Sequence, residues 1–269
     1  MASWVAALLG VVEGLTEYLP VSSTAHIDLA GHLLHVADMP GFASFDVFIQ
    51  LGAILAVLIH YRELLWARTR GLVQRDPKAI RLFSALFIGF IPAAVLGLLF
   101  NKAIKAHLFG LASICVAFVV GGLVMIAVEL WRERNSEKGL DGLEHVGLGR
   151  GLAIGVGQCF ALIPGTSRSM STIVAGQLAG LSTATSAEFS FLLGLVTLSA
   201  ACVYTGLKER HELMHAGALA ILIGVGVSFL VAWAVIAGFI RYLQKHGLAP
   251  FGVYRIALAA LVWWALIRV

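Results

Sequence analysis

Charged residues are scarce in this chain of 269 residues: Asp, Glu, Lys and Arg make up 13% of it, whereas 59% is hydrophobic. Soluble domains carry about 25% charged residues, so the composition argues against a soluble globular fold. The mean hydropathy of +0.92 points the same way. We therefore expect an α-helical protein that crosses a membrane several times.

Cysteine is also scarce. Cys115, Cys159 and Cys202 are an odd number and lie in apolar stretches. This argues against a disulfide framework and against a thiolate metal site, and we expect buried, unreactive thiols. The features of a signal peptide are scarce too, because the first apolar run, 4–12, has no basic residues before it and no small-residue cleavage site after it. We therefore treat the start as mature sequence.

The basic residues indicate an orientation in the membrane rather than binding to nucleic acid. The net charge is +4, but the positive side chains lie in short loops between apolar runs. Twelve of the nineteen lie in one set of loops and five in the alternate set, while Arg168 and Arg255 lie inside apolar segments. The richer set comprises Arg62, Arg68, Arg70, Arg75, Lys78, Arg81, Arg132, Arg134, Lys138, Arg150, Arg241 and Lys245; the poorer set comprises Lys102, Lys105, Lys208, Arg210 and Arg268. The positive-inside rule makes the richer set cytoplasmic and both termini extracytoplasmic.

The apolar runs predict six crossings and two interrupted segments. Runs of about 20 residues, enough to span a bilayer, lie near 44–61, 82–100, 109–131, 187–206, 216–240 and 251–267. Segments 4–35 and 151–180 differ, because Pro, Gly and Ser cut each into two pieces of roughly 15 residues, or about 22 Å of helix. Such pieces are too short to cross. The predicted fold class is all-α and polytopic, with six transmembrane helices plus two re-entrant helix pairs in one integral membrane domain, 1–269.

Internal repetition relates the two interrupted segments. The pairs are Leu19-Pro20-Val21-Ser22-Ser23 with Ile163-Pro164-Gly165-Thr166-Ser167, Asp46 with Glu188, and Phe109-Gly110 with Phe251-Gly252, at offsets of 142 to 144 residues. Each repeat, about 1–135 and about 148–269, holds one re-entrant pair and three crossings. Because three is odd, the second repeat enters from the opposite face, giving an inverted-topology repeat. The break around Pro20 is called the first tip and the break around Pro164 the second tip. We expect the two tips to meet near the midplane of the membrane.

The first tip places two carboxylates at membrane depth, where charge is costly. Glu13 and Glu17 are four residues apart and share one helical face, so they could hold a metal ion, a proton or a cation. The alternative is a solvated or salt-bridged helix end.

The first tip also carries hydroxyls and an imidazole. Pro20 ends the first helix, and Ser22 or Ser23 is placed to cap the next. His26 lies one turn beyond Ser23, within reach of its hydroxyl or of a phosphate oxygen. The alternative for His26 is a structural role, the commoner one for an isolated histidine.

The second tip predicts an anion site. Pro164 and Gly165 precede a helix whose first N–H groups and positive dipole end face outward. Arg168 adds a planar fork suited to two phosphate oxygens. Hydroxyls on or near the same turn come from Ser167, Ser169 and Thr172. The alternative for Arg168 is a salt bridge to a carboxylate of the first tip.

At these residues the chain resembles the undecaprenyl-diphosphate phosphatase family, also called the bacitracin-resistance protein family. The resemblance covers nearly the whole chain. One signature, Glu-x-x-x-Glu followed by Pro-Val-Ser-Ser-x-x-His, is met by Glu13, Glu17, Pro20, Ser22, Ser23 and His26. The other, Pro-Gly-x-Ser-Arg-Ser-x-x-Thr, is met by Pro164, Gly165, Ser167, Arg168, Ser169 and Thr172. Asp28 departs from the pattern, which has an apolar residue there.

The resemblance implies an enzyme of the bacterial plasma membrane, with its active site open to the periplasm. It would hydrolyse undecaprenyl (polyprenyl) diphosphate to the monophosphate and inorganic phosphate, recycling the carrier for peptidoglycan synthesis and conferring bacitracin resistance. The expected partners are this lipid and the bilayer, without nucleic acid, and a homodimer is left open.

The resemblance, together with these residue types, implies the expected roles. Catalysis is assigned to Glu17, Ser23, His26 and Arg168, and substrate binding to Glu13, Ser22, Gly165, Ser167, Ser169 and Thr172. Ser23 is either the nucleophile or the group that positions water, and His26 is its base or the acid for the leaving phosphate. Glu13 and Glu17 are expected to bind a divalent cation, Mg or Ca, to orient His26, or to do both.

A rival interpretation is a lipid-phosphate flippase or a secondary transporter of an anion, because such carriers also use inverted repeats with broken helices. A carrier needs neither nucleophile nor base, so it would tolerate changes at Ser23 and His26 but not at Arg168. A scaffold or channel without chemistry does not predict the clustering of these groups.

Overall fold

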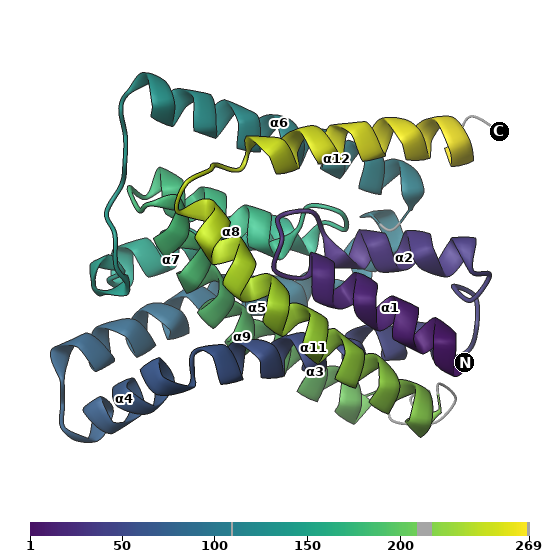
Figure 1. Cartoon of the computed structure of the whole chain (residues 1–269), viewed down its shortest axis with the longest axis horizontal. Coiled ribbons are helices and arrows are strands. Elements are labelled where there is room, and N and C mark those ends of the chain that lie inside the picture. Colours follow the sequence, from purple (N-terminus) through teal and green to yellow (C-terminus); the bar gives the residue numbers. More distant parts are fainter. Residues whose placement is uncertain (109, 209–216, 268–269) are drawn as a thin grey trace. The chain divides into compact units, whose positions relative to one another are not determined.

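The computed structural model describes residues 1–108, 110–208 and 217–267, and its regular structure there is helical (Figure 1). Eleven α-helices are described, and one isolated bridge joins Leu140 and Leu181. The helices are α1 Ser3–Thr16, α2 Ser23–Leu33, α3 Phe42–His60, α4 Arg62–Val73, α5 Pro77–Leu108, α6 Leu111–Arg134, α7 Leu148–Gln158, α8 Arg168–Leu178, α9 Thr183–Lys208, α11 Ala218–Leu243 and α12 Ala249–Val262. Phe109, Arg210 and Arg268, used in the sequence analysis, lie outside the described residues.

Five of these helices are long and apolar enough to cross a membrane: α3, α5, α6, α9 and α11. They coincide with five of the six predicted runs, which confirms the polytopic all-α class. The sixth run corresponds to α12, a shorter apolar helix that continues into a π-helical turn, Trp263–Ile267. The basic loop expected after the first crossing contains a helix, α4, which carries Arg68 and Arg70.

Large apolar side chains cover the outside of the spans. Leu99 on α5 is 72% exposed and Leu222 on α11 is 70% exposed. Exposed apolar surface on this scale is unfavourable in water and fits a surface covered by lipid.

Both interrupted segments form two short helices, as predicted. In the first, α1 and α2 lie side by side (Figure 1), and residues 17–22 with Pro20 separate them. In the second, α7 is followed by a 3₁₀ turn, Cys159–Leu162, and the loop 163–167 leads into α8. Proline lacks an N–H and clashes with the preceding turn, so each helix ends before it.

The two helix pairs repeat the same unusual backbone conformations. Ser22 (φ 72°) precedes α2, and Ser167 (φ 75°) precedes α8. After these helices, His35 (φ 55°) and Gly180 (φ 84°) occupy equivalent places. Both pairs of positions are 145 residues apart, one more than the offset read from the sequence at the tips.

The same helix ending closes α2 and α8. The N–H of Val36 donates to Gly31 O at 2.8 Å, and the N–H of Leu181 donates to Gly176 O at 3.0 Å. This 6→1 bond, closed by a left-handed residue, is the Schellman motif.

The chain forms two compact units. The first comprises Met1–Leu19, Ser23–Arg62 and Gly194–Phe239. Its core includes the fully buried Leu9, Phe45 and Ile49. Helix α1 lies against α11 at glycine, since a Cβ at Gly10 would meet Gly224 O at 2.6 Å.

The second unit comprises Pro20–Ser22, Glu63–Leu193 and Ile240–Val269. In it α6 and α12 lie side by side (Figure 1). They cross where a Cβ on either Gly122 or Gly252 would be 2.7 Å from the carbonyl oxygen of the other. Close approach through small residues is a common way to pack helices in a membrane.

Candidate active site

The first unit brings the two predicted carboxylates to the end of α1. Glu13 is fully buried and Glu17 is 6% exposed. Glu17 keeps helical geometry, and its N–H donates to Glu13 O at 2.9 Å. The two side chains therefore leave the same face of the helix, one turn apart.

Ser23 is directed toward Glu17. The Ser23 Oγ donates to Glu17 Oε2 at 2.5 Å, across the loop that separates α1 from α2. Both side chains are buried. A hydroxyl whose proton points at a buried carboxylate has the geometry of a nucleophile and its base.

Tyr18 fixes the start of this loop. Its ring is fully buried, and its hydroxyl donates to Ala53 O on α3 at 2.7 Å. Because Tyr18 follows Glu17 directly, this bond restrains the backbone that carries the carboxylate.

His26 and Asp28 lie on α2 beyond Ser23. His26 is half-buried in the first turn of the helix, as the spacing predicted. Its assignment as base or acid stays a prediction, because the recorded acceptor of the Ser23 hydroxyl is Glu17. Asp28 faces His32, with 3.7 Å between Oδ1 and Nδ1. Burial raises the pKa of Asp28, and the His32 charge partly offsets this.

The second unit holds the predicted anion site. Gly165 has φ 87°, and a Cβ there would lie 3.0 Å from Ile114 Cα on α6. Ser167 caps α8, since its Oγ accepts from the N–H of Met170 at 3.2 Å. The tip is therefore pressed against α6, and only glycine fits position 165 without strain.

Arg168 is the first residue of α8. Its Nη1 donates to Ser190 O at 2.8 Å, and its Nη2 is 3.5 Å from Ser169 Oγ. Thr172 Oγ1 lies 2.6 Å from Ser190 Oγ and donates to Arg168 O at 2.8 Å. Thr172 thus braces the turn that presents Arg168. Arg168 and the carboxylates of the first tip belong to different units, so the alternative of a salt bridge between them stays open.

Two buried polar side chains, Gln158 and Arg255, are not among the predicted site residues. Gln158 ends α7 and is 3% exposed, and neither atom of its amide has a hydrogen-bond partner within the described part of the chain. Counting back 145 residues reaches Glu13, so the two tips carry an amide and a carboxylate at matching places. Arg255 on α12 is fully buried. In the sequence, the position of Arg255 inside an apolar segment was the signal that could have marked it as a functional residue.

The donor set for a divalent cation is small. Among the described residues, no three of His, Cys, Asp and Glu gather as a metal cage. The first tip offers two carboxylates, Glu13 and Glu17. That set fits Mg²⁺, which proteins commonly hold through one or two carboxylates together with waters and substrate phosphates.

The cysteines carry no recorded chemistry. All three are free; Cys115 and Cys202 are buried and Cys159 is half-buried.

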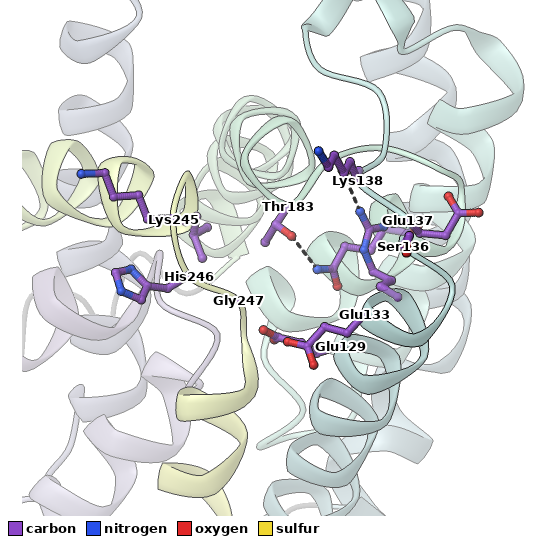
Figure 2. Close-up of a pocket in the computed structure, with 12 residues that line it drawn as sticks. Glu129, Glu133, Ser136, Glu137, Lys138, Thr183, Lys245, His246 and Gly247 are labelled. Atoms are coloured by element: carbon purple, nitrogen blue, oxygen red, sulfur yellow. Dashed lines mark hydrogen bonds between the residues drawn. The ribbon is translucent and has the colours of Figure 1, made fainter.

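A polar cavity of about 380 Å³ lies in the second unit (Figure 2). Glu129 borders it and accepts from the N–H groups of Leu248 and, at 2.7 Å, Ala249, so it caps α12. Lys138, also on its wall, accepts through its carbonyl from Arg132 at 3.1 Å. These charged residues stabilise the neighbouring loops. None of the predicted site residues lines the cavity.

Comparison with known proteins identifies related chains. Residues 6–261 match the family model described as bacitracin resistance protein BacA. A protein of Sorangium cellulosum called undecaprenyl-diphosphatase is 55% identical over 262 residues, covering 96% of this chain and 85% of its own. One of Rhizorhabdus wittichii with the same name is 44% identical, covering 95% of each chain. One of Rhodospirillum rubrum, undecaprenyl-diphosphatase 2, is 46% identical, covering 96% of this chain and 92% of its own.

Proposed function

Because this chain belongs to the bacitracin resistance protein BacA family, we propose that it is an undecaprenyl-diphosphate phosphatase. It hydrolyses undecaprenyl diphosphate to undecaprenyl phosphate and inorganic phosphate. It does so in the bacterial plasma membrane, and thereby recycles the carrier for peptidoglycan synthesis.

The observation that carries this function is the hydrogen bond from Ser23 Oγ to Glu17 Oε2. In the proposed first step, Glu17 takes the Ser23 proton while Oγ attacks the terminal phosphorus. The bond from that phosphorus to the bridging oxygen breaks, and the lipid monophosphate leaves. His26 donates a proton to the leaving phosphate or orients it. Water then hydrolyses the phosphoserine and releases inorganic phosphate.

The second tip would hold the charge of the reacting phosphates. The N-terminal end of α8 favours an anion, and the Arg168 guanidinium can bind two oxygens at once. Stabilisation of charge by fixed donors is the main source of catalysis in phosphoryl transfer. Gly165, Ser167 and Ser169 supply the close backbone and the hydroxyls of this cradle.

Glu13 and Glu17 would hold a divalent cation, Mg²⁺ or Ca²⁺. When bound, the cation neutralises diphosphate charge. Loss of phosphate release in chelator, restored by adding one metal, tests this assignment.

An apolar groove is suited to the polyprenyl tail. It measures about 500 Å³ and lies between α5 and α7. Ile163, at one end of the groove, directly precedes Pro164 at the second tip. A tail lying in the groove would therefore lead to the anion cradle.

The membrane topology is proposed as six crossings and two re-entrant pairs in an inverted repeat, with both termini and the site on the periplasmic side. The fourteen residues of α12 continue through five of the π-helical turn. This supports a sixth crossing. The matching conformations at Ser22 and Ser167, and at His35 and Gly180, support the repeat.

The test is phosphate release from a long-chain polyprenyl diphosphate by the purified full chain in detergent. We expect release by wild type, and we expect a substrate labelled on its terminal phosphate to leave label on Ser23. Release without labelling would favour water as the nucleophile. No release from folded protein would favour the flippase, for which the Ser23 to Glu17 bond has no use.

A further inference from the structure

The guanidinium of Arg255 is buried without a carboxylate. Its recorded partners in the described part of the chain are five carbonyl oxygens and the ring of Phe118, 4.9 Å from Cζ. Nη1 donates to Pro20 at 3.2 Å and Thr166 at 3.0 Å, Nη2 to Gly165 at 2.8 Å and Ala117 at 2.9 Å, and Nε to Phe118 at 3.4 Å. All of these residues belong to the second unit.

The acceptors come from three separate places in the chain. Ala117 and Phe118 lie on α6, which α12 crosses at Gly252, one turn before Arg255. Pro20 belongs to the first tip, and Gly165 and Thr166 belong to the second. The side chain of Arg255, which α12 carries and which also binds carbonyls of α6, therefore binds the backbone of both tips.

The site for this guanidinium is closely fitted. A Cβ on Gly121 of α6 would lie 2.6 Å from Nη2 and 3.1 Å from Cζ. The absence of a side chain at position 121 makes room for the fork.

Packing alone does not require a charge here. Burying a guanidinium destabilises the fold through lost hydration, and well-packed apolar side chains often replace buried charges without loss of stability. The planar fork offers instead a fixed pattern of five donors, which lysine cannot reproduce.

The carbonyls it holds determine where the neighbouring N–H groups point. In a trans peptide, the C=O and the following N–H point in opposite directions. Holding the Pro20 and Thr166 carbonyls toward Arg255 therefore turns the N–H groups of Val21 and Ser167 away from it. These peptides directly precede Ser22 and Arg168, where the reacting groups begin.

We propose that Arg255 is a positioning residue of the phosphatase, which ties the two tips together through their carbonyls and fixes the peptides that face the diphosphate. This inference rests on the proposed function. Arg255 touches no reacting atom and acts through the backbone.

The test compares Arg255→Lys and Arg255→Met with matched variants of Arg132. Arg132 is also buried, at 7% exposed, and donates to the carbonyls of Gln177, Leu181 and Lys138, none of which belongs to either tip. Unfolding temperature, kcat and KM for a long-chain polyprenyl diphosphate are measured on the full chain in detergent.

We expect Arg255→Lys to lower kcat about 10- to 100-fold, the size of effect that a shift of about 1 Å produces, with little change in KM. Arg132→Lys should lose as much thermal stability and keep the wild-type kcat. Wild-type kcat in Arg255→Lys would overturn the proposal. So would an equal loss of kcat in both variants at equal loss of stability.

A second variant covers the case in which Arg255→Lys fails to fold. Gly121→Ala keeps the charge and pushes on the fork, and we expect it to lower kcat while KM stays near wild type. If it folds with unchanged kcat, the proposal is wrong. Wild-type protein that releases no phosphate would instead refute the proposed function, which separates the two failures.

Discussion

The loops 17–22 and 163–167 enter their second helices in the same way, through a serine with positive φ. The next residue is Ser23 in one and Arg168 in the other. Five residues before each of these serines, at the same offset of 145 residues, Glu17 corresponds to Leu162. The comparison teaches that one backbone conformation can present different residue types, and in the proposed mechanism it serves bond making at the first tip and charge binding at the second.

The largest effect should come from removing either member of the carboxylate–hydroxyl pair of the first tip, Glu17 or Ser23. We expect Ser23→Ala and Glu17→Gln each to lower kcat by about 10⁴-fold or more, because a nucleophile and its base act as a unit. The measurement is phosphate release under saturating substrate. Ser171→Ala is the matched control, since this α8 hydroxyl donates to Ser167 O at 2.9 Å, and it should stay near wild type. Equal losses in Ser171→Ala and Ser23→Ala would remove the distinction between the tips.

Removing the charge of the second tip should cost less. Arg168→Ala is expected to lower kcat/KM by about 10²- to 10³-fold, the usual effect of losing one donor to a transition-state anion. Arg168→Lys should recover part of this, because it restores the charge without the fork. Inhibition by inorganic phosphate should weaken in parallel. Wild-type turnover by Arg168→Ala would sink the assignment.

The third prediction compares the stability of two glycine substitutions, one in the second tip and one after α8. Gly165→Ala combines positive φ with a Cβ against Ile114 and should cost about 2–3 kcal/mol. Gly180→Ala also has positive φ, but nothing lies within 4 Å of its Cβ, so it should cost about 1 kcal/mol. His35 at the matching place of the first pair shows that a side chain can occupy this conformation. Thermal unfolding in detergent that ranks the two variants the other way would contradict the argument.

The smallest effect concerns Asp28, which corresponds to the fully buried Ile173 of the second pair at the same offset. Burial raises the pKa of Asp28 in the folded protein, so its ionised form destabilises the fold. That cost is present above the folded pKa and disappears below the unfolded one. Asp28→Asn should therefore raise the unfolding temperature near pH 8 and lose this gain as the pH falls toward about 4. The gain should stay below about 1 kcal/mol, because the side chain is 38% exposed and solvent screens it. A gain that does not vary with pH would point to another cause.

Hydrophobic run length and helix breakers predicted most of the fold. Five long helices and two broken pairs follow from the need to satisfy every backbone group within the bilayer. Helix α4 was missed because its charge resembles that of a loop. The extra residue in the second tip was missed because Pro20 and Pro164 align by letter, whereas the left-handed conformation at Ser22 and Ser167 aligns one position later.

The site was predictable in its residue types and less so in its pairings. Glu17 and Ser23 were both expected, but the sequence favoured His26 as the partner of the hydroxyl, because spacing along one helix ignores a contact across the loop. Arg255 gave no local pattern, since its partners are backbone carbonyls up to 235 residues away. Because every residue has a backbone carbonyl, the residue types in the sequence do not show which carbonyls accept these bonds.

The separation of Pro20 and Arg255 along the sequence also determines the order in which they are synthesised. The first tip is made 235 residues before the arginine that holds it. At typical rates of 5–20 residues per second, that is a wait of roughly 12 to 47 seconds on the ribosome and in the insertion machinery. A nascent chain therefore already carries Ser23, Glu17 and Arg168 before Arg255 is present to bind the carbonyls of the two tips. Competence to turn over the carrier should arrive with the last helix, so a stalled or prematurely terminated chain would occupy the membrane without consuming substrate.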